Sequence, residues 1–133
     1  MRIPKVSICI PSYNYGRFIG QCIESVLNQT FQDFEIIVVD NASTDCTPEV
    51  VQRYKETDKR IRYIRNEVNL GMVKNWNKSI RLAQSKYIGI LHADDAYLPN
   101  MLEIMTKMLD SNNEAGAAFY ANLEIDEKGR VLT

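Results

Sequence analysis

The sequence predicts an α/β protein in which a mostly parallel central sheet lies between two layers of helices. Short apolar runs of strand-like composition alternate with stretches whose apolar residues recur at helical spacing. This alternation is typical of a parallel sheet with helices on both faces. No linker or low-complexity stretch interrupts the pattern, and 133 residues suffice for a single domain with one core.

Five runs of apolar, β-branched or aromatic residues have the composition of strands. They are residues 6–10, 35–39, 61–64, 87–91 and 117–120. Pro11 is expected to end the first strand, and the continuous apolar character of 35–39 is typical of a strand buried on both faces. Residues 126–129, Asp-Glu-Lys-Gly, predict the turn of a hairpin that reaches Val131.

Four stretches between or after these strands predict amphipathic helices. They begin near Phe18, Thr47, Val73 and Leu98. Thr47 is the expected N-cap of the second helix, because Pro48 and Glu49 suit its first turn. The expected buried stripe of the third helix is Val73, Trp76, Ile80 and Ala83. That of the fourth helix, opened by Pro99, is Leu98, Met101, Leu102, Met105, Met108 and Leu109.

The composition excludes several classes of protein. Hydrophobic residues make up 45% of the chain, charged residues 25%, and the net charge is −1. This balance supplies no basic surface for nucleic acid or anionic lipid. Three widely separated cysteines without zinc-ligand spacing indicate a reduced, cytoplasmic setting. We expect no signal peptide and no membrane-spanning helix, while membrane association through other regions stays open.

Polar residues follow each of the first four strands, at the edge where parallel sheets bind ligands. These segments are Pro-Ser-Tyr-Asn at 11–14, Asp-Asn-Ala-Ser at 40–43, Arg-Asn at 65–66 and His-Ala-Asp-Asp at 92–95. The adjacent carboxylates of Asp94 and Asp95 suit Mg²⁺ or Mn²⁺ with a phosphate as a further ligand. Turn and helix-cap chemistry is the alternative explanation for both acidic segments.

The usual glycine-rich phosphate-binding loops do not occur in the sequence. It contains neither G-x-x-x-x-G-K-S/T nor a G-x-G-x-x-G after the first strand. A bound cation is therefore the expected neutraliser of a diphosphate.

Four segments of the chain resemble the family 2 inverting glycosyltransferases. They are residues 6–14, 34–45, 69–71 together with Asn77, and 91–95, in the order in which the family has them. The resemblance implies the GT-A, Rossmann-like fold, a nucleotide-diphosphate sugar donor (most commonly a UDP-sugar), and Mn²⁺ or Mg²⁺. It covers only the N-terminal, nucleotide-binding part of the family's catalytic domain, so the C-terminal part of the domain is expected to be missing.

The resemblance also assigns roles to single residues. Pro11 and Tyr13 match the loop against the base, and Asp40 matches the acid that binds the nucleobase. Asp94 matches the acid near the ribose, and Asp95 matches the metal-ligating acid. The other expected donor-binding residues are Ser12, Asn14, Asn41, Ser43, Asn77, His92 and Ala93. As a strand-end carboxylate, Asp40 should contribute little to the core.

Two positions depart from the family's pattern. His92 stands where many members have the first Asp of the metal motif, and Trp76 stands where many have an Arg. His92 is either a donor to the sugar or a phosphate, or a hydrogen-bonded residue that closes a buried strand. Trp76 is either a core residue or a platform for a base.

The catalytic base of an inverting transferase is expected beyond Thr133. Glu103 and Asp110 belong to a predicted helix, and Asp126 belongs to a predicted turn. We therefore expect donor binding without transfer, and self-association or association with the missing C-terminal part through exposed apolar surface. The acceptor, whether saccharide, lipid or protein, is not identified. A non-catalytic nucleotide-sensing or scaffold domain and a sugar-nucleotide pyrophosphorylase remain alternatives, although 12–17 match the latter's glycine-rich loop poorly.

Overall fold

The computed structural model describes residues 2–132, which form two units, one ending at Glu103 and the other beginning at Ile104. The first unit contains a four-stranded, all-parallel sheet with the strand order β3-β2-β1-β4. Its strands are β1 (Val6–Ser12), β2 (Phe34–Asp40), β3 (Ile61–Arg65) and β4 (Tyr87–Ile90). The sequence therefore located these four strands correctly.

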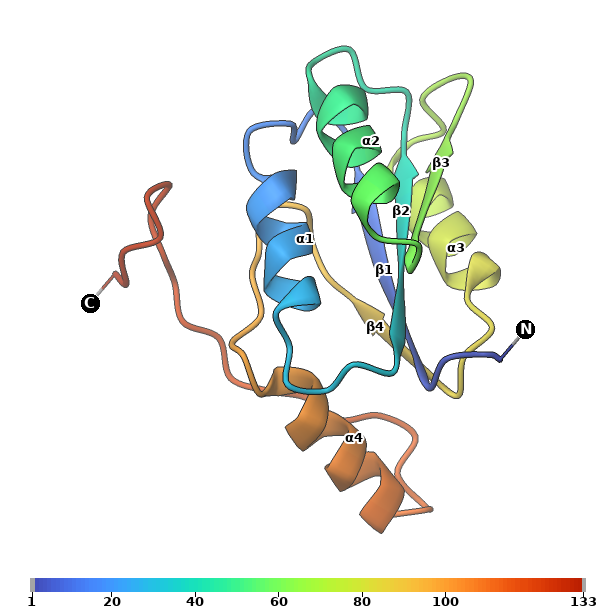
Figure 1. Cartoon of the computed structure of the whole chain (residues 1–133), viewed down its shortest axis with the longest axis vertical. Coiled ribbons are helices and arrows are strands. Elements are labelled where there is room, and N and C mark those ends of the chain that lie inside the picture. The colour runs from blue at the N-terminus through green and yellow to red at the C-terminus, as the bar shows by residue number, and fades with distance from the viewer. Residues whose placement is uncertain (1, 133) are drawn as a thin grey trace. The chain divides into compact units, whose positions relative to one another are not determined.

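Helices cover both faces of this sheet (Figure 1). The helices are α1 (Ile19–Leu27), α2 (Thr47–Thr57) and α3 (Met72–Leu82), and α4 (Met101–Ser111) begins at the end of the first unit. Helices α1 and α2 lie together on one face, and α3 lies on the other. The expected three-layer α/β/α arrangement with a parallel sheet is confirmed.

The main core lies between the sheet and helices α1 and α2. Ile8, Ile10, Ile36 and Val38 point toward this face and are completely buried. On the other face, Cys9, Ile37 and Val39 pack against Leu82 and Ala83 at the end of α3. Alternate residues of β1 and β2 thus supply two cores, which explains their unbroken apolar sequences.

The cysteines are free thiols, as expected from their spacing. Cys9 and Cys22 are buried, and burial raises the pKa of Cys9 to about 11. Burial also raises the pKa of Cys22 far above its ordinary value. Both residues therefore act as small apolar core residues.

Pro11 does not end β1, contrary to the expectation from sequence. The carbonyl of Cys9 accepts a hydrogen bond from Leu91 of the β4 side, whereas the carbonyl of Ser12 accepts one from Asn41 of the β2 side. Pro11 therefore faces the β4 side, two residues beyond Cys9, the last residue of β1 that pairs with β4. Its missing N–H affects that side alone, so β1 continues to Ser12 through its pairing with β2.

Strand β4 is less buried than its apolar sequence suggests. It is an edge strand of the sheet that residues 2–132 form, and the side chain of Ile88 is 46% exposed. The expected buried run 87–91 is therefore correct in position but wrong in burial.

The buried face of α3 is polar at its start, so the expected stripe is partly wrong. Val73 is 66% exposed, while Asn75 and Ser79 are buried. Asn75 is buried because its side chain binds backbone and side-chain groups at the strand ends, which an apolar residue cannot do. Leu82 and Ala83 form the apolar end of this face.

The second unit contains no strand at 117–120 among its described residues, so this expectation is wrong. A run of strand-like composition becomes a strand only where a neighbouring strand pairs with it, and Phe119 is 89% exposed here. The expected hairpin is present in reduced form, as an antiparallel bridge between Ile125 and Val131.

Helix α4 buries only part of its expected stripe. Leu102 is 4% exposed, but Leu98 is 66% and Met108 is 53% exposed. Nowhere in residues 2–132 does a helix combine the length and apolar character that crossing a bilayer requires.

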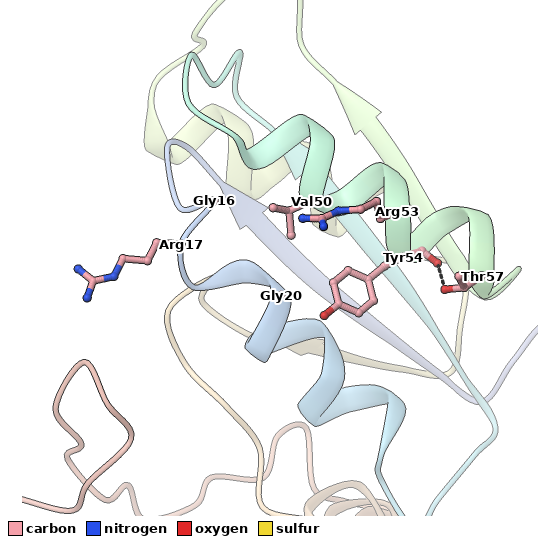
Figure 2. A pocket seen from close by; sticks show the side chains of 7 residues that line it. All are labelled: Gly16, Arg17, Gly20, Val50, Arg53, Tyr54 and Thr57. Atoms are coloured by element: carbon pink, nitrogen blue, oxygen red, sulfur yellow. Dashed lines mark hydrogen bonds between the residues drawn. The ribbon is translucent and has the colours of Figure 1, made fainter.

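A hollow of about 390 Å³ lies between α1 and α2 (Figure 2). Its lining residues are Gly16, Arg17, Gly20, Val50, Arg53, Tyr54 and Thr57. Arg17 points away from the other lining side chains. The Tyr54 hydroxyl donates a hydrogen bond to Glu24, and burial together with this acceptor raises the pKa of Tyr54 to about 12. None of the residues predicted to bind a ligand lines this hollow.

Helix α2 begins at Thr47, with Cys46 rather than Thr47 at the N-cap. The carboxylate of Asp45 accepts hydrogen bonds from the Thr47 N–H at 3.0 Å, the Thr47 hydroxyl at 2.6 Å and the Gly16 N–H at 2.9 Å. Burial opposes ionisation of Asp45, but these hydrogen bonds outweigh it and lower its pKa. Asp45 thus joins the loop after β1 to the start of α2.

We expect Asp45→Ala to lower the free energy of unfolding at neutral pH by about 1 kcal/mol, because the Gly16 and Thr47 donors lose their acceptor. Because the folded state lowers the pKa of Asp45, its contribution is fully present above the ordinary pKa of 3.8 and is lost as the pH falls below it. Urea titrations at several pH values should show that the difference in unfolding free energy between wild type and variant decreases in acid. Asp33→Ala, at an exposed ion pair, is the control. A difference in unfolding free energy that stays constant with pH would contradict the role of the ionised Asp45 carboxylate.

Candidate functional site

The ends of the three paired strands place the polar segments side by side. Ser12 of β1 is in register with Asp40 of β2, which is in register with Arg65 of β3. The Asn41 N–H donates to the Ser12 carbonyl at 2.8 Å, and the Asn66 N–H donates to the Asp40 carbonyl at 2.8 Å. The ladder therefore continues into the segments that the sequence singled out.

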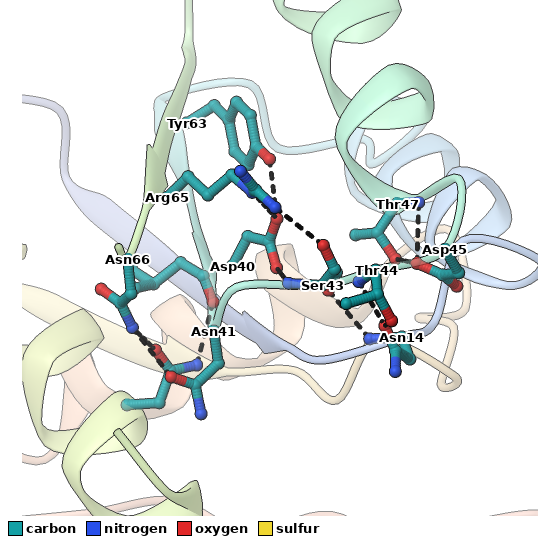
Figure 3. Close-up of polar contacts among 12 residues, drawn as sticks. Asn14, Asp40, Asn41, Ser43, Thr44, Asp45, Thr47, Tyr63, Arg65 and Asn66 are labelled. Atoms are coloured by element: carbon teal, nitrogen blue, oxygen red, sulfur yellow. Dashed lines mark hydrogen bonds and ion pairs between the residues drawn. The ribbon is translucent and has the colours of Figure 1, made fainter. Parts of the chain in front are cut away.

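Asp40 is the centre of a buried polar cluster (Figure 3). Its side chain has no exposed surface. One carboxylate oxygen accepts the Ser43 N–H at 2.9 Å, and the other accepts the Tyr63 hydroxyl at 2.8 Å and pairs with the Arg65 Nε at 3.3 Å. Burial and the neighbouring carboxylate raise the pKa of Tyr63 far above its ordinary value, so its hydroxyl remains a donor.

The expectation that Asp40 contributes little to the core is therefore wrong. A fully buried carboxylate requires donors from the protein, and Asp40 has three of them, one from the turn after β2 and two from β3. The side chain of Arg65 is 51% exposed and also donates to the Ser43 carbonyl at 2.8 Å. Arg65 covers the carboxylate from the solvent side.

The loops after β1 and β2 hold each other in place. The Asn14 N–H donates to Ser43 Oγ at 2.9 Å, and Asn14 Oδ1 accepts the Thr44 N–H at 2.8 Å. Asn14 and Ala42 both have left-handed backbone conformations, with φ of 58° and 63°. Asn tolerates this conformation well, whereas Ala42 adopts it at some cost in strain. The tight turn around Ala42 lets the Ser43 N–H reach Asp40.

Four asparagines, three of them buried, form a second cluster beside Asp40. Asn41 Oδ1 accepts the Asn66 side chain at 3.0 Å and the Leu70 N–H at 2.8 Å, and Asn41 Nδ2 donates to Asn69 Oδ1 at 2.8 Å. Asn66 also donates to Asn75 Oδ1 at 2.8 Å, and Asn75 donates to the Val39 carbonyl at 2.9 Å. This network connects the ends of β2 and β3 with the loop 66–71 and helix α3.

Helix α1 holds the segment that follows β4. Cys22 Sγ and the Asp95 N–H both donate to the His92 carbonyl, at 3.3 and 3.0 Å. Ser25 Oγ accepts the Tyr97 N–H at 3.0 Å, and Gln29 Nε2 donates to the Leu98 carbonyl at 2.7 Å. The turn containing the acidic pair thus has a fixed backbone.

His92, Asp94 and Asp95 form a cluster that fits a divalent cation. Their ligand atoms all lie within 4.8 Å of one another, and all three residues are exposed. Neighbouring ligands of an ion held at about 2.1 Å are roughly 3 Å apart, so small rotations of these side chains suffice. The alternative in which His92 closes a buried strand is wrong, because His92 is exposed and its ring lies edge-on against Trp76, with centroids 4.9 Å apart.

The remaining predicted site residues differ in accessibility. Tyr13 is 44% exposed, and Asn77 is exposed on α3. Pro11 and Ala93 are buried, and Ala93 belongs to the main core. Ser12 is buried, and its hydroxyl is a buried side-chain group without a hydrogen-bond partner among the described residues.

Comparisons with known proteins identify the family. The model of the family described as glycosyl transferase family 2 matches residues 7–132. The chain belongs to this family. It is 40% identical over 131 residues to an uncharacterized glycosyltransferase of Methanocaldococcus jannaschii, covering 97% of this chain and 45% of that protein. It is 34% identical over 132 residues to the chondroitin synthase of Escherichia coli, covering 99% of this chain and 19% of the synthase.

Solved structures of glycosyltransferases share the fold of this family 2 chain. S. aureus TarS, solved with UDP, has a TM-score of 0.76 at 27% identity, over 82% of this chain and 33% of TarS. The mannosyltransferase of Pyrobaculum calidifontis, solved with GDP-Man and Mn²⁺, has a TM-score of 0.74 at 27% identity, over 82% of this chain and 33% of that one. These matches establish the GT-A fold, and the chain spans less than half the length of each of these relatives and solved structures.

The two departures from the family 2 pattern touch each other. Trp76 and His92 are far apart in the sequence, but their rings meet at an interplanar angle of 61°. Trp76 is half-buried on α3, immediately after the asparagine that joins this helix to the sheet. Trp76 is therefore not a core residue of the expected stripe.

Sequence reasoning placed Arg65 and Asn66 at the ligand-binding edge without giving them a role, and it missed Tyr63 and Asn75. The signal for Tyr63 and Arg65 was available, because residues two apart on a strand point to the same face and Arg65 ends its strand. No such signal marked Asn75, whose helix position matches neither an apolar stripe nor an exposed face. Its role follows only from the distance between α3 and the strand ends.

We expect Asp40→Ala to lower the free energy of unfolding by about 2–4 kcal/mol, because it leaves the Tyr63 hydroxyl and Ser43 N–H without an acceptor. Tyr63→Phe removes one donor and should cost about 1 kcal/mol. Chemical denaturation of both variants tests this order. If Asp40→Ala unfolds at the wild-type midpoint, Asp40 does not organise the strand ends.

Proposed function

We propose that this chain binds a nucleotide-diphosphate sugar, first of all a UDP-sugar, together with Mn²⁺ or Mg²⁺, and that it forms the donor-binding part of an inverting glycosyltransferase. The observation that carries this proposal is the His92, Asp94 and Asp95 cluster beside the β4 end of the sheet. Support comes from relatives that are glycosyltransferases and from TarS, which has been solved with UDP and with UDP-GlcNAc.

The proposed site divides into a base end and a phosphate end. At the base end we place the residues that follow β1 and β2, namely Pro11, Ser12, Tyr13, Asn14, Asp40, Asn41 and Ser43. Tyr13 offers an exposed ring, and Ser12 a hydroxyl whose hydrogen-bonding capacity is unused. At the phosphate end we place Asn77, His92, Ala93, Asp94 and Asp95.

Asp40 needs a rearrangement before it can accept a hydrogen bond from a nucleobase. Its carboxylate is covered, but the Arg65 contact of 3.3 Å is the longest of its three, and Arg65 is half exposed. Movement of the Arg65 side chain would uncover one carboxylate oxygen while the Ser43 and Tyr63 hydrogen bonds remain. In this proposal Arg65 then lies free to contact the base or ribose.

Asp95, with Asp94 beside it, would hold the cation against the diphosphate. When bound, such a cation neutralises the charge that develops on the leaving diphosphate. The protein's part is to keep the carboxylates in place through the turn at the His92 carbonyl. No glycine-rich cradle shares this task.

The base that deprotonates the acceptor is not proposed among the acids after Asp95. Glu103 accepts a hydrogen bond from the Thr30 hydroxyl at 2.9 Å, and Asp110 is a residue of α4. The Asp126 carboxylate accepts the Lys128 and Arg130 N–H groups and pairs with the Arg130 side chain at 2.7 Å. These hydrogen bonds lower the pKa of Asp126, which makes it a poor base.

We expect UDP to bind more tightly in Mn²⁺ than in EDTA, and Asp95→Asn to remove most of that difference. Loss of a cation ligand should weaken UDP binding in Mn²⁺ by at least about tenfold, since loss of an outer-shell partner alone costs that much. Affinity in EDTA should be unchanged. Asp33→Asn, which removes a carboxylate at the opposite ends of the strands, is the matched control for calorimetric titration. Equal weakening of UDP binding in both buffers would contradict the role of Asp95 as a cation ligand.

We also expect the purified chain to bind a donor without transferring its sugar to an acceptor. The absence of a positioned base alone slows transfer by about 10²–10⁴-fold. An assay with labelled UDP-sugars and mixed acceptors, run beside the UDP titration, measures this. Robust turnover that depends on Asp95 would show that a base lies within the chain.

A further inference from the structure

We propose that His92 supplies a nitrogen ligand to the cation, so that the site selects a first-row transition-metal ion such as Co²⁺ or Mn²⁺ over Mg²⁺. The proposal rests on the metal-assisted donor binding proposed above and specifies which class of ion the site takes. It concerns the one position of the metal motif that lacks a carboxylate.

The geometry places the imidazole among the ligands. A nitrogen of His92 and carboxylate oxygens of Asp94 and Asp95 lie within 4.8 Å of one another, and each group is exposed. The turn that carries them is fixed, because the His92 carbonyl accepts both Cys22 Sγ and the Asp95 N–H. Only side-chain rotation is needed to close the three groups around one ion.

The chemistry of the donor set distinguishes the ions. Mg²⁺ prefers oxygen ligands in octahedral geometry and retains several waters, whereas imidazole is a good ligand for first-row transition metals. Histidine in place of the carboxylate found in many relatives also removes one negative charge from the site. These three ligands therefore bind Mg²⁺ less tightly than three carboxylates would. Their affinity is highest for ions that bind nitrogen well. Affinity should follow the order Mg²⁺ below Mn²⁺ below Co²⁺.

Trp76 is a positioning residue for this imidazole. Its ring meets the His92 ring edge-on at 4.9 Å, which limits the orientations that the imidazole can take. The helix carrying Trp76 is held to the sheet by the Asn75 hydrogen bonds to the Val39 carbonyl and from Asn66. These hydrogen bonds fix the position of α3 on the sheet and hence the position of the indole ring.

Calorimetric titration of UDP into the chain with Mg²⁺, Mn²⁺ or Co²⁺ tests the proposal. For wild type, the affinity in Co²⁺ should exceed that in Mg²⁺ by about tenfold or more. His92→Asp restores a third carboxylate without nitrogen and should bring the Co²⁺ to Mg²⁺ ratio close to one by raising the Mg²⁺ affinity. His92→Ala removes nitrogen without adding charge and should lower the Co²⁺ affinity alone. His92 is exposed, so the fold should tolerate both changes.

Spectroscopy gives a second readout that does not depend on UDP affinity. The chain has one histidine, so histidine labelled with ¹⁵N reports on a single imidazole. With Co²⁺ and UDP, a ligated ring should show strongly contact-shifted signals that are missing from the Mg²⁺ complex. Trp76→Leu should reduce the Co²⁺ preference while leaving the Mg²⁺ affinity unchanged; equal losses with both ions would make its role merely structural.

The outcomes separate this proposal from the proposed function. Metal-dependent UDP binding with no preference among the ions, and no contact-shifted imidazole, overturns the role of His92 while donor binding stands. UDP binding that no cation strengthens overturns both.

Discussion

The Asp40 carboxylate is removed from water at the end of β2, and the strand ends are arranged to satisfy it. A buried charge is tolerated only when the protein supplies hydrogen bonds in place of water. Here they come from the backbone of Ser43, the hydroxyl of Tyr63 and the guanidinium of Arg65. The turn after β2 and the last residues of β3 are therefore fixed by one side chain, and Asn14 connects the loop after β1 to the same turn.

The asparagine cluster extends this constraint across the sheet to α3. An amide carries both donors and acceptors, so Asn41, Asn66 and Asn75 satisfy one another and the chain around them without a net charge. Such buried networks stabilise a unique arrangement when every member has partners, because an unpaired group is costly. As α3 also carries Trp76 against His92, the cluster links the proposed base end of the site to its proposed cation end.

The His92–Trp76 contact gives the two departures from the family pattern a common physical meaning. An arginine at position 76 beside an aspartate at position 92 would be a charge pair, whereas this chain has two aromatic rings in contact. In the proposed site an imidazole thus takes the place of one carboxylate ligand, and the indole takes the place of the cation that would have paired with that carboxylate.

The sequence by itself determined the layers, the four parallel strands and the edge at which polar groups gather, because these follow from local periodicity and from strand ends. It also located the acidic pair Asp94–Asp95. Tertiary structure alone decided that Asp40 is buried, that β1 continues through Pro11, that α3 buries Asn75 rather than Val73, and that 117–120 is not a strand. Each of these outcomes depends on which groups lie opposite a residue in the folded chain. Asp40 needs hydrogen-bond donors, Asn75 needs a backbone carbonyl, and an apolar run needs a strand to pair with. Pro11 is tolerated because β2 pairs with β1 on the other side. Such partners are distant in the sequence, and no local pattern encodes them.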